Sequence, residues 1–123
     1  VLRLPAANGA VAVIDTRTDS LVDSIELTGK NPFGATKGLT VHDGALWIAQ
    51  AGEFNVFDGG IERIDLASGT PGGWLITEAE LGGDVTDFAL VSERRAYALL
   101  NRPGFRNALV SIDLVERRVL ATH

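Results

Sequence analysis

The sequence predicts an all-β fold made of short antiparallel strands that recur in units of about 50 residues. Three stretches support this prediction, because each is an aliphatic run that ends in Ile-Asp. They are residues 11–16 (VAVIDT), 60–66 (GIERIDL) and 109–114 (LVSIDL). The aspartates of the three stretches are 50 and 48 residues apart. A nearly constant period of this length is typical of repeat proteins, and four antiparallel strands per unit are typical of a β-propeller blade.

The middle unit shows its four strands most clearly. Asp43-Gly44 stands between two apolar runs, which is the strongest short-range signal for a two-residue hairpin turn. A stretch rich in Gly, Ser and Pro at 67–73 marks another turn. The predicted strands of this unit are residues 37–42, 45–50, 60–66 and 74–81. No stretch has a sustained 3.6-residue apolar period, so the sequence predicts no helix.

The flanking units follow the same order but are incomplete. The predicted strands before the middle unit are residues 1–4, 11–16 and 21–27. Those after it are residues 85–91, 95–100 and 109–114, with loops at 82–84 and 101–107 and a last strand that begins at 118. The chain therefore divides into a partial blade (1–27), a complete blade (28–81) and a nearly complete blade truncated in its last strand (82–123).

These units amount to about 2.75 blades of one domain fragment. A closed propeller takes four to eight blades. We therefore expect the chain to be part of a larger ring, or to complete a ring with other copies through its open blade edges. The chain begins at Val1 and contains no Met, which favours a processed or excised piece of a longer protein.

The composition excludes several classes of function. The net charge is −5 and the sequence has no basic run, so it cannot neutralise the phosphates of a nucleic acid. No run of 18 apolar residues occurs, so we expect no membrane span. The chain has no cysteine, which excludes disulfides and thiolate metal sites.

The sequence also lacks recognisable catalytic motifs. Its two histidines are His42, beside the hairpin turn, and His123, the last residue, and neither has a nucleophile or metal-ligand spacing around it. The glycines at 52, 59 and 60 lack the Lys and the following helix that a phosphate-binding loop requires. The sequence therefore predicts no catalytic residue.

The recurring aspartates have a structural interpretation. A carboxylate at the end of a strand can accept backbone N–H groups within the turn that follows. Asp15, Asp65 and Asp113 occupy the same place in each unit. We therefore predict that they close turns and do not bind a ligand.

Both halves of the repeat resemble the YVTN-type β-propeller repeats. In that family an apolar strand, an Asp-Gly hairpin and a strand with an aromatic residue precede a Gly-rich loop and the pattern VxVIDxxT. Residues 39–49 (LTVHDGALWIA) resemble the first half, and residues 11–18 (VAVIDTRT) resemble the second. Residues 31–34 (NPFG) resemble the Pro-x-Gly connection between such blades. The resemblance extends over nearly the whole chain.

The resemblance implies a propeller of six to eight blades, with seven the commonest number. It also implies a bacterial protein that is extracytoplasmic, whether periplasmic, secreted or on the cell surface. Some proteins with this fold are lactonases, and others are binding or surface-layer proteins. WD-type repeats are less similar because no Trp-Asp pair closes a strand, and Kelch repeats because the diglycines here fall at unequal places in the units.

Polar residues near one set of loops are candidate ligand-binding residues. In a propeller, the loops that join strands two and three, and strand four to the next blade, lie on the same rim around the central channel. The candidates on this rim are Asn31, Lys37, Asn55, Asp58, Asp84, Asp87, Asn101 and Arg102. Asp58, Asp84 and Asp87 could hold a hard cation such as calcium, although the same residues suit ordinary turns. The sequence predicts no other cofactor.

Aromatic residues form a second group. Phe33, Phe54, Phe57 and Phe105 fall in the same loops, where they could line a ligand surface or cap the inner ends of the blades. Capping is the preferred interpretation. A separate pair, Trp47 and Tyr97, is repeat-equivalent, and we predict that it packs between blades.

The sequence thus favours a non-catalytic, exported scaffold whose loop rim binds a protein, a glycan or a small ligand. One alternative is a piece of a lactonase-like, metal-dependent hydrolase whose remaining carboxylates lie on other blades. A second alternative is a structural surface protein that assembles through its blade edges.

Overall fold

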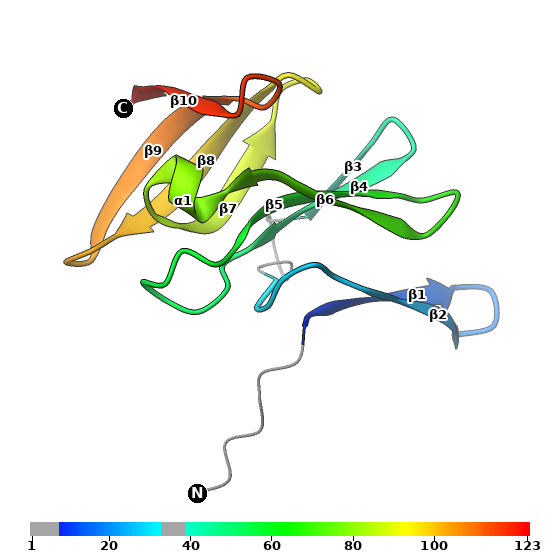
Figure 1. Cartoon of the computed structure of the whole chain (residues 1–123). Coiled ribbons are helices and arrows are strands. Elements are labelled where there is room, and N and C mark those ends of the chain that lie inside the picture. Colours follow the sequence, from blue (N-terminus) through cyan, green and yellow to red (C-terminus); the bar gives the residue numbers. More distant parts are fainter. Residues whose placement is uncertain (1–7, 33–38) are drawn as a thin grey trace, which may run out of the picture.

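A computed structural model describes residues 8–32 and 39–123 of the chain (Figure 1). These residues form ten strands and one short helix. In chain order they are β1 (Ala10–Asp15), β2 (Ser20–Glu26), β3 (Leu39–His42), β4 (Ala45–Gln50), β5 (Gly60–Asp65), β6 (Thr70–Thr77), α1 (Glu78–Leu81), β7 (Asp84–Leu90), β8 (Arg95–Arg102), β9 (Arg106–Asp113) and β10 (Arg118–Thr122). The predicted strand at 1–4 and the start of the one at 37–42 lie outside the described residues.

The strands form three antiparallel sheets, and within each sheet every strand pairs with the next one along the chain. β1 and β2 make a hairpin, β3 to β6 make a four-stranded sheet, and β7 to β10 make another. Asp43 and Gly44 both have positive φ, 46° and 68°, as the predicted hairpin turn requires. The predictions of an all-β fold and of four-stranded antiparallel sheets are confirmed.

The recurring aspartates close turns, as predicted. The Oδ1 atoms of Asp15, Asp65 and Asp113 each accept a backbone N–H from two or three residues later, at 2.8, 2.8 and 3.0 Å respectively. These backbone hydrogen bonds are the main reason that the pKa values of Asp65 and Asp113 lie below the ordinary value. An identical position in each unit thus corresponds to an identical local role.

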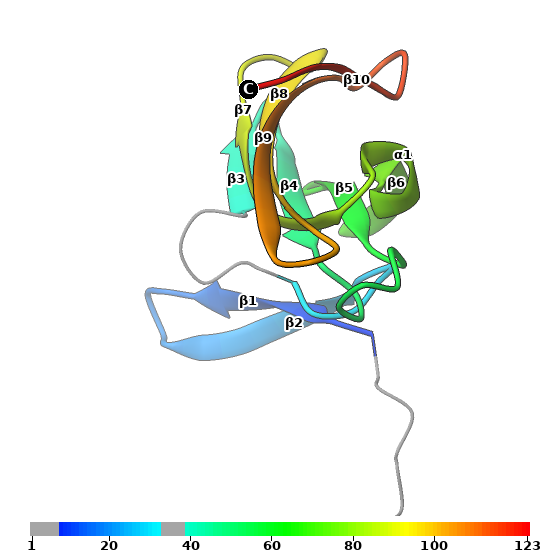
Figure 2. The same cartoon turned by 90° about the vertical axis from the view of Figure 1, so that its left-hand side faces the viewer.

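The three sheets stack face to face in sequence order, with the hairpin at one end and the β7–β10 sheet at the other (Figures 1 and 2). The β3–β6 sheet lies between them, and all six residues of β4 are buried. The core between the hairpin and the β3–β6 sheet contains Ile25, Leu27, Leu46, Ile48 and Ile64. A larger core, which includes Trp47, Ile61, Phe88, Leu100, Val110 and Ile112, joins the β3–β6 and β7–β10 sheets. Burial of these faces is the main apolar contribution to stability.

A buried carboxylate also ties the hairpin to the middle sheet. Glu62 of β5 is fully buried. Its Oε2 accepts the backbone N–H of Thr28 at 3.1 Å and the side-chain amide of Gln50 at 2.6 Å, and its Oε1 accepts the Thr28 hydroxyl. Gln50 Oε1 in turn accepts the N–H of Gly29 at 3.0 Å. The segment after β2 is therefore held to β4 and β5 by a satisfied polar network.

The prediction that the chain contains no helix is wrong. The predicted return strand at 74–81 ends at Thr77, and α1 follows. Thr77 is the N-cap: its hydroxyl accepts the N–H of Glu80 at 3.3 Å, while the Glu80 carboxylate accepts the N–H of Thr77 at 2.7 Å. Gly82, with φ of 76°, ends the helix. This capping box is visible in the sequence as Thr-x-x-Glu, but one helical turn is too short to show an apolar period.

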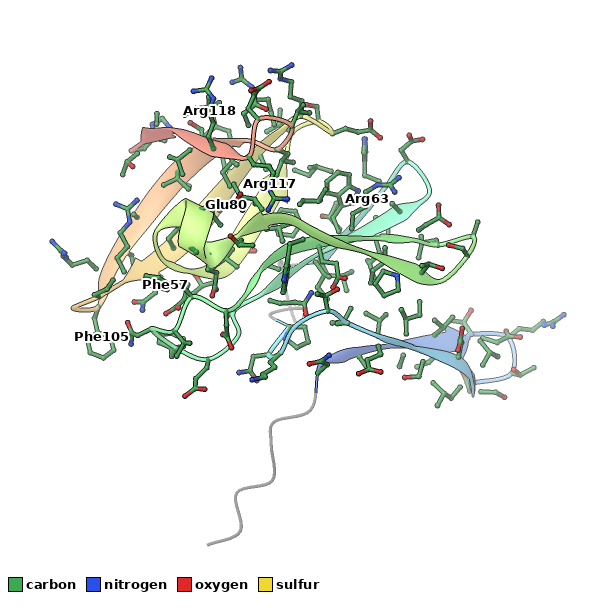
Figure 3. All side chains as sticks on the ribbon, viewed as in Figure 1. Phe57, Arg63, Glu80, Phe105, Arg117 and Arg118 are labelled. Carbon is green, nitrogen blue, oxygen red and sulfur yellow. The ribbon has the colours of Figure 1, made fainter. Side chains whose placement is uncertain are left out.

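The helix is fixed to the far end of the next sheet by an ion pair. Arg117 Nε donates to Glu80 Oε1 and Arg117 Nη2 donates to Glu80 Oε2, both at 2.8 Å (Figure 3). A bidentate pair of this kind is stronger than a simple surface ion pair. Its hydrogen bond to Arg117 is the main reason that the pKa of Glu80 falls to about 2.

Two further boundaries differ from the sequence prediction. Residues 101–107 were expected to form a loop, but β8 continues to Arg102 and β9 begins at Arg106. The two strands pair as far as Arg102 with Arg106, which leaves only residues 103–105 as a turn. Asp84, expected in a loop, is the first residue of β7. The β7–β10 sheet therefore reaches further toward the loops than expected.

Trp47 and Tyr97 were both predicted to pack between blades, and only Trp47 does. Trp47 is 2% exposed, in the core that β3–β6 shares with β7–β10. Tyr97 is 42% exposed, because it lies on the outward face of the last sheet and no described segment covers that face. The sequence shows that Trp47 and Tyr97 occupy equivalent positions in the repeat. It does not show which of their two sheets has a further sheet packed against it.

Substitution of repeat-equivalent isoleucines tests this stacking. Ile64 is fully buried and its equivalent Ile14 is 57% exposed. We expect Ile64→Val to lower the free energy of unfolding by about 1 kcal/mol, whereas Ile14→Val has an effect below about 0.5 kcal/mol. Urea denaturation at low protein concentration measures both values. Equal losses from the two substitutions would contradict the stacking order.

Candidate functional site

One set of connections lies together at one end of the stack. Residues 28–32 after β2, the β4–β5 loop, the β8–β9 turn and the start of β7 lie toward the left in Figure 1, whereas the turns after β1, β3 and β5 lie at the opposite end. We call the described part of this end the loop rim. It comprises residues 28–32, 51–59, 84 and 101–106.

Asp58 and Asp84 hold the β4–β5 loop in shape. The Asp58 carboxylate accepts the N–H of Glu53 at 2.6 Å, and both oxygens of the buried Asp84 accept the N–H of Asn55 at 3.0 and 3.1 Å. Asn55 has φ of 63°, a left-handed conformation that asparagine tolerates better than most residues. These two candidate ligand residues therefore already have backbone partners.

The β2–β3 connection is joined to the same loop. The side-chain amide of Asn31 donates to the Gly52 carbonyl, and the backbone N–H of Gly52 donates to the Lys30 carbonyl at 3.1 Å. Lys30 Nζ also lies 3.8 Å from an Asp58 oxygen. Gly52 itself has φ of 57°, and a Cβ there would lie 2.0 Å from that carboxylate. Loops that are distant in sequence thus form one connected surface.

Glu78 joins the loop rim to the following sheet, and sequence reasoning missed it. Its carboxylate is fully buried and accepts the N–H of Gly59 at 2.9 Å and that of Val85 at 2.7 Å. Burial raises the pKa of Glu78 to about 7, and the charges of Asp84 and Asp58 add to this rise, while the two hydrogen bonds oppose it. No pattern in the sequence distinguishes this glutamate from the exposed acids around it.

Asn101 and Arg102 bring unpartnered donors to the loop rim. Asn101 pairs across the sheet with Asp84 and is 7% exposed. Neither the amide nitrogen of Asn101 nor the buried Nε of Arg102 finds an acceptor among the described residues. A buried donor without an acceptor costs about 1–3 kcal/mol, and such groups call for an explanation.

The loop rim also exposes apolar side chains. Phe54 and Val56 of the β4–β5 loop are exposed, and Phe105 at the tip of the β8–β9 turn is 86% exposed. The prediction that Phe54 and Phe105 cap the blades is therefore wrong, because neither packs against the core. Phe57 is half-buried at the same end (Figure 3). Phe33 lies outside the described residues.

Phe57 and Phe105 share an unusual backbone. They are 48 residues apart, the spacing of the repeat, and their φ values are 61° and 56°. The left-handed region costs a bulky L-residue about 1–2 kcal/mol. The repeat thus places an aromatic side chain in a strained conformation twice, at corresponding points of the loop rim.

The remaining candidates do not join this group. Asp87 accepts the N–H of Phe88 at 2.9 Å and lies on the outward face of the β7–β10 sheet, beside Tyr97 and Leu99. Lys37 lies outside the described residues. Asp58, Asp84 and Asp87 do not converge, and nowhere in residues 8–32 and 39–123 do three His, Asp or Glu side chains form a group that could hold a metal.

Comparison with protein-family models gives no match to this chain, and comparison with curated proteins gives none either. Across the part of the chain that the structure describes, no helix is long and apolar enough to span a membrane.

The pH dependence of stability tests the position of Glu78. The unfolded chain loses this proton near pH 4.5 and the folded chain near pH 7, so the folded state binds more protons between these values. Stability should therefore fall as the pH rises through this window, by up to roughly 3 kcal/mol, and Glu78→Gln should remove the decline.

Glu80→Gln is the matched control, measured by urea denaturation between pH 2 and 8. The pKa of Glu80 is lowered, so its contribution is present above pH 4.5 and is lost as the pH falls toward 2. Its substitution should lower stability by a constant amount above pH 4.5 and remove the loss toward pH 2, while the decline between pH 4.5 and 7 stays as in the parent chain. An unchanged decline between pH 4.5 and 7 in Glu78→Gln would show that Glu78 is not the group responsible.

Proposed function

We propose that this chain is a segment of a YVTN-type β-propeller, most simply of a propeller with seven blades. We propose that it acts outside the cytoplasm as a non-catalytic binding scaffold. The face-to-face stacking of consecutive antiparallel sheets supports the propeller. The resemblance of the repeats to the YVTN family supports the cellular location. The loop rim is then the ligand-binding surface.

One observation carries the binding proposal. The loop rim exposes Phe54, Val56 and Phe105 next to two buried, unpartnered donors on Asn101 and Arg102. Loops that only connect strands gain nothing from a strained, fully exposed phenylalanine or from unsatisfied donors. Strain and unsatisfied polar groups are typical of binding sites, where the ligand supplies the missing partner.

A glycan is the ligand class that fits this chemistry best. Aromatic rings offer flat apolar surfaces to the C–H faces of sugars, while amide and guanidinium donors suit hydroxyl oxygens. A protein or another small ligand would need a larger continuous apolar patch or a deeper pocket.

Substitution of Phe105 tests the proposal directly. We expect the chain to bind members of a glycan array, and Phe105→Ala to weaken binding of the best array sugar about tenfold in isothermal titration calorimetry, the equivalent of about 1.4 kcal/mol. Val115→Ala, at an exposed valine in the β9–β10 turn, is the control and should bind normally. No binding to any array sugar, or equal loss in the control, would contradict the glycan proposal.

Phe105→Gly separates binding from folding. Glycine adopts the left-handed conformation without strain, and the phenylalanine side chain buries almost nothing. We therefore expect Phe105→Gly to raise the free energy of unfolding by up to about 1 kcal/mol while it weakens sugar binding as Phe105→Ala does. A loss of stability in thermal unfolding would indicate that Phe105 has a structural role instead.

A further inference from the structure

The β8–β9 turn carries positive charge without a matching carboxylate. Residues 101–107 (NRPGFRN) contain two arginines and no acid, although the whole chain has a net charge of −5. Arg102 and Arg106 lie directly opposite each other, because β8 pairs with β9 as far as these two residues. Like charges directly opposite one another destabilise a pair of strands. Two arginines at the end of this pairing therefore call for an explanation.

The other end of the same two strands has the usual arrangement of charges. There Arg95 lies opposite Asp113, so the charges of the two partners attract. Asp113 also forms an ion pair with Arg94 at 3.0 Å. The pairing of β8 with β9 thus places opposite charges together at one end and like charges together at the end that belongs to the loop rim.

The repeat shows that the positive charge is specific to the last unit. Phe105 and Phe57 are 48 residues apart and share the left-handed backbone. The residue that follows Phe57 is Asp58, whereas the residue that follows Phe105 is Arg106. The strained aromatic residue is therefore common to both units, and the charge beside it is reversed.

Both arginines lie on the face of the last sheet that packs against the middle sheet. Arg102 is two residues after Leu100 in β8, and Arg106 is four residues before Val110 in β9; residues at even spacing along a strand share a face. Leu100 and Val110 are fully buried in the core that joins the two sheets. A following blade would pack against the opposite face of this sheet, so it would not cover the arginines.

Neither guanidinium has a carboxylate partner within the described part of the chain, where no ion pair involves Arg102 or Arg106. Arg102 Nε is buried without an acceptor, and Arg106 Nε donates to the Pro103 carbonyl at the long distance of 3.4 Å. A Cβ at Gly83 would lie 3.0 Å from Arg102 Cγ, so the stem of this arginine packs closely on the backbone before β7. The fold thus holds Arg102 in place without supplying its anion.

The neighbouring acids already have other partners. Asp84, in the strand beside β8, is fully buried, and both of its oxygens accept the N–H of Asn55. Asp58 accepts the N–H of Glu53 and lies 3.8 Å from Lys30 Nζ. These carboxylates hold the β4–β5 loop, so an anion for the two arginines has to come from outside the described residues.

We propose that Arg102 and Arg106 bind the acidic group of a glycan, either the carboxylate of a uronic acid or a sulfate ester. This proposal rests on the glycan-binding function proposed above and names the class of sugar. A guanidinium donates two parallel N–H groups to an oxyanion, and an anion between two arginines offsets their mutual repulsion. Phe105, directly before Arg106, contacts the apolar face of the same sugar.

A glycan array followed by titration of matched sugars tests the proposal. The array contains neutral, uronate-bearing and sulfated oligosaccharides, and we expect the strongest binding among the acidic ones. Isothermal titration calorimetry then compares each acidic sugar that binds with its neutral form, the methyl ester of a uronate or the desulfated form of a sulfate. We expect the neutral form to bind about tenfold more weakly. Binding of the acidic form should weaken as NaCl is raised from about 0.05 to 0.5 M.

Charge-removing variants locate the acidic group on the chain. Arg106→Gln and Arg102→Gln should each weaken binding of the acidic sugar about tenfold and reduce its advantage over the neutral form. Arg106 is exposed, and its substitution removes a like-charge pair, so the midpoint of thermal unfolding should not fall. Arg95→Gln removes the same charge at the other end of β8; it is the matched control and should bind like the parent chain.

The outcomes separate this proposal from the glycan-binding function on which it rests. Binding confined to neutral sugars would overturn the proposal and leave that function standing, as would acidic sugars that bind both β8–β9 turn variants as tightly as the parent chain. An equal loss in Arg95→Gln would also overturn it, because the sugars would then respond only to the net charge of the chain. No binding to any sugar of the array would contradict the glycan-binding function as well.

Discussion

β4, in the interior of the β3–β6 sheet, is buried on both faces, and the arrangement of the other sheets follows from this constraint. A strand that packs against another layer on one side only alternates buried and exposed residues. β8 does so from Arg95 to Leu100, whereas all six residues of β4 are buried. A strand with no polar face can fold only between two other layers. The hairpin and the β7–β10 sheet supply those layers, and their own outward faces then become the ends of the stack.

Apolar faces alone would let the sheets slide over one another, and buried carboxylates oppose this. Glu62 accepts hydrogen bonds from the segment after β2, and Glu78 accepts them from Gly59, just before β5, and from Val85 in β7. Each acid joins two layers at a defined register, because its hydrogen bonds are directional and the cost of breaking them in a dry interior is high. The acid at the second junction also links the fold to the loop rim, since one of its partners is Gly59, at the end of the β4–β5 loop.

The sequence predicts the features that depend on local chemistry. The Ile-Asp repeats, the Asp43-Gly44 turn and the turn-closing aspartates each require only neighbouring residues, and the structure confirms them. It also predicts which polar residues lie near the loops. It could not predict that Asp58 and Asp84 already hold backbone N–H groups, or that Glu78 is buried, because those partners are 5 to 29 residues away. The exposure of Tyr97 and Phe105 depends on which neighbouring elements are present, and no pattern in one repeat contains that information.

Methyl and aromatic NOESY spectra of the labelled chain, at a concentration that keeps it monomeric, test the order of the stack most directly. We expect cross-peaks between Ile64 and the hairpin residues Ile25 and Leu27. We also expect cross-peaks between the Trp47 ring and apolar residues of the β7–β10 sheet, and none from Ile14 to any other sheet. Cross-peaks confined within each sheet, or contacts from Ile14 to the β3–β6 sheet, would contradict this order.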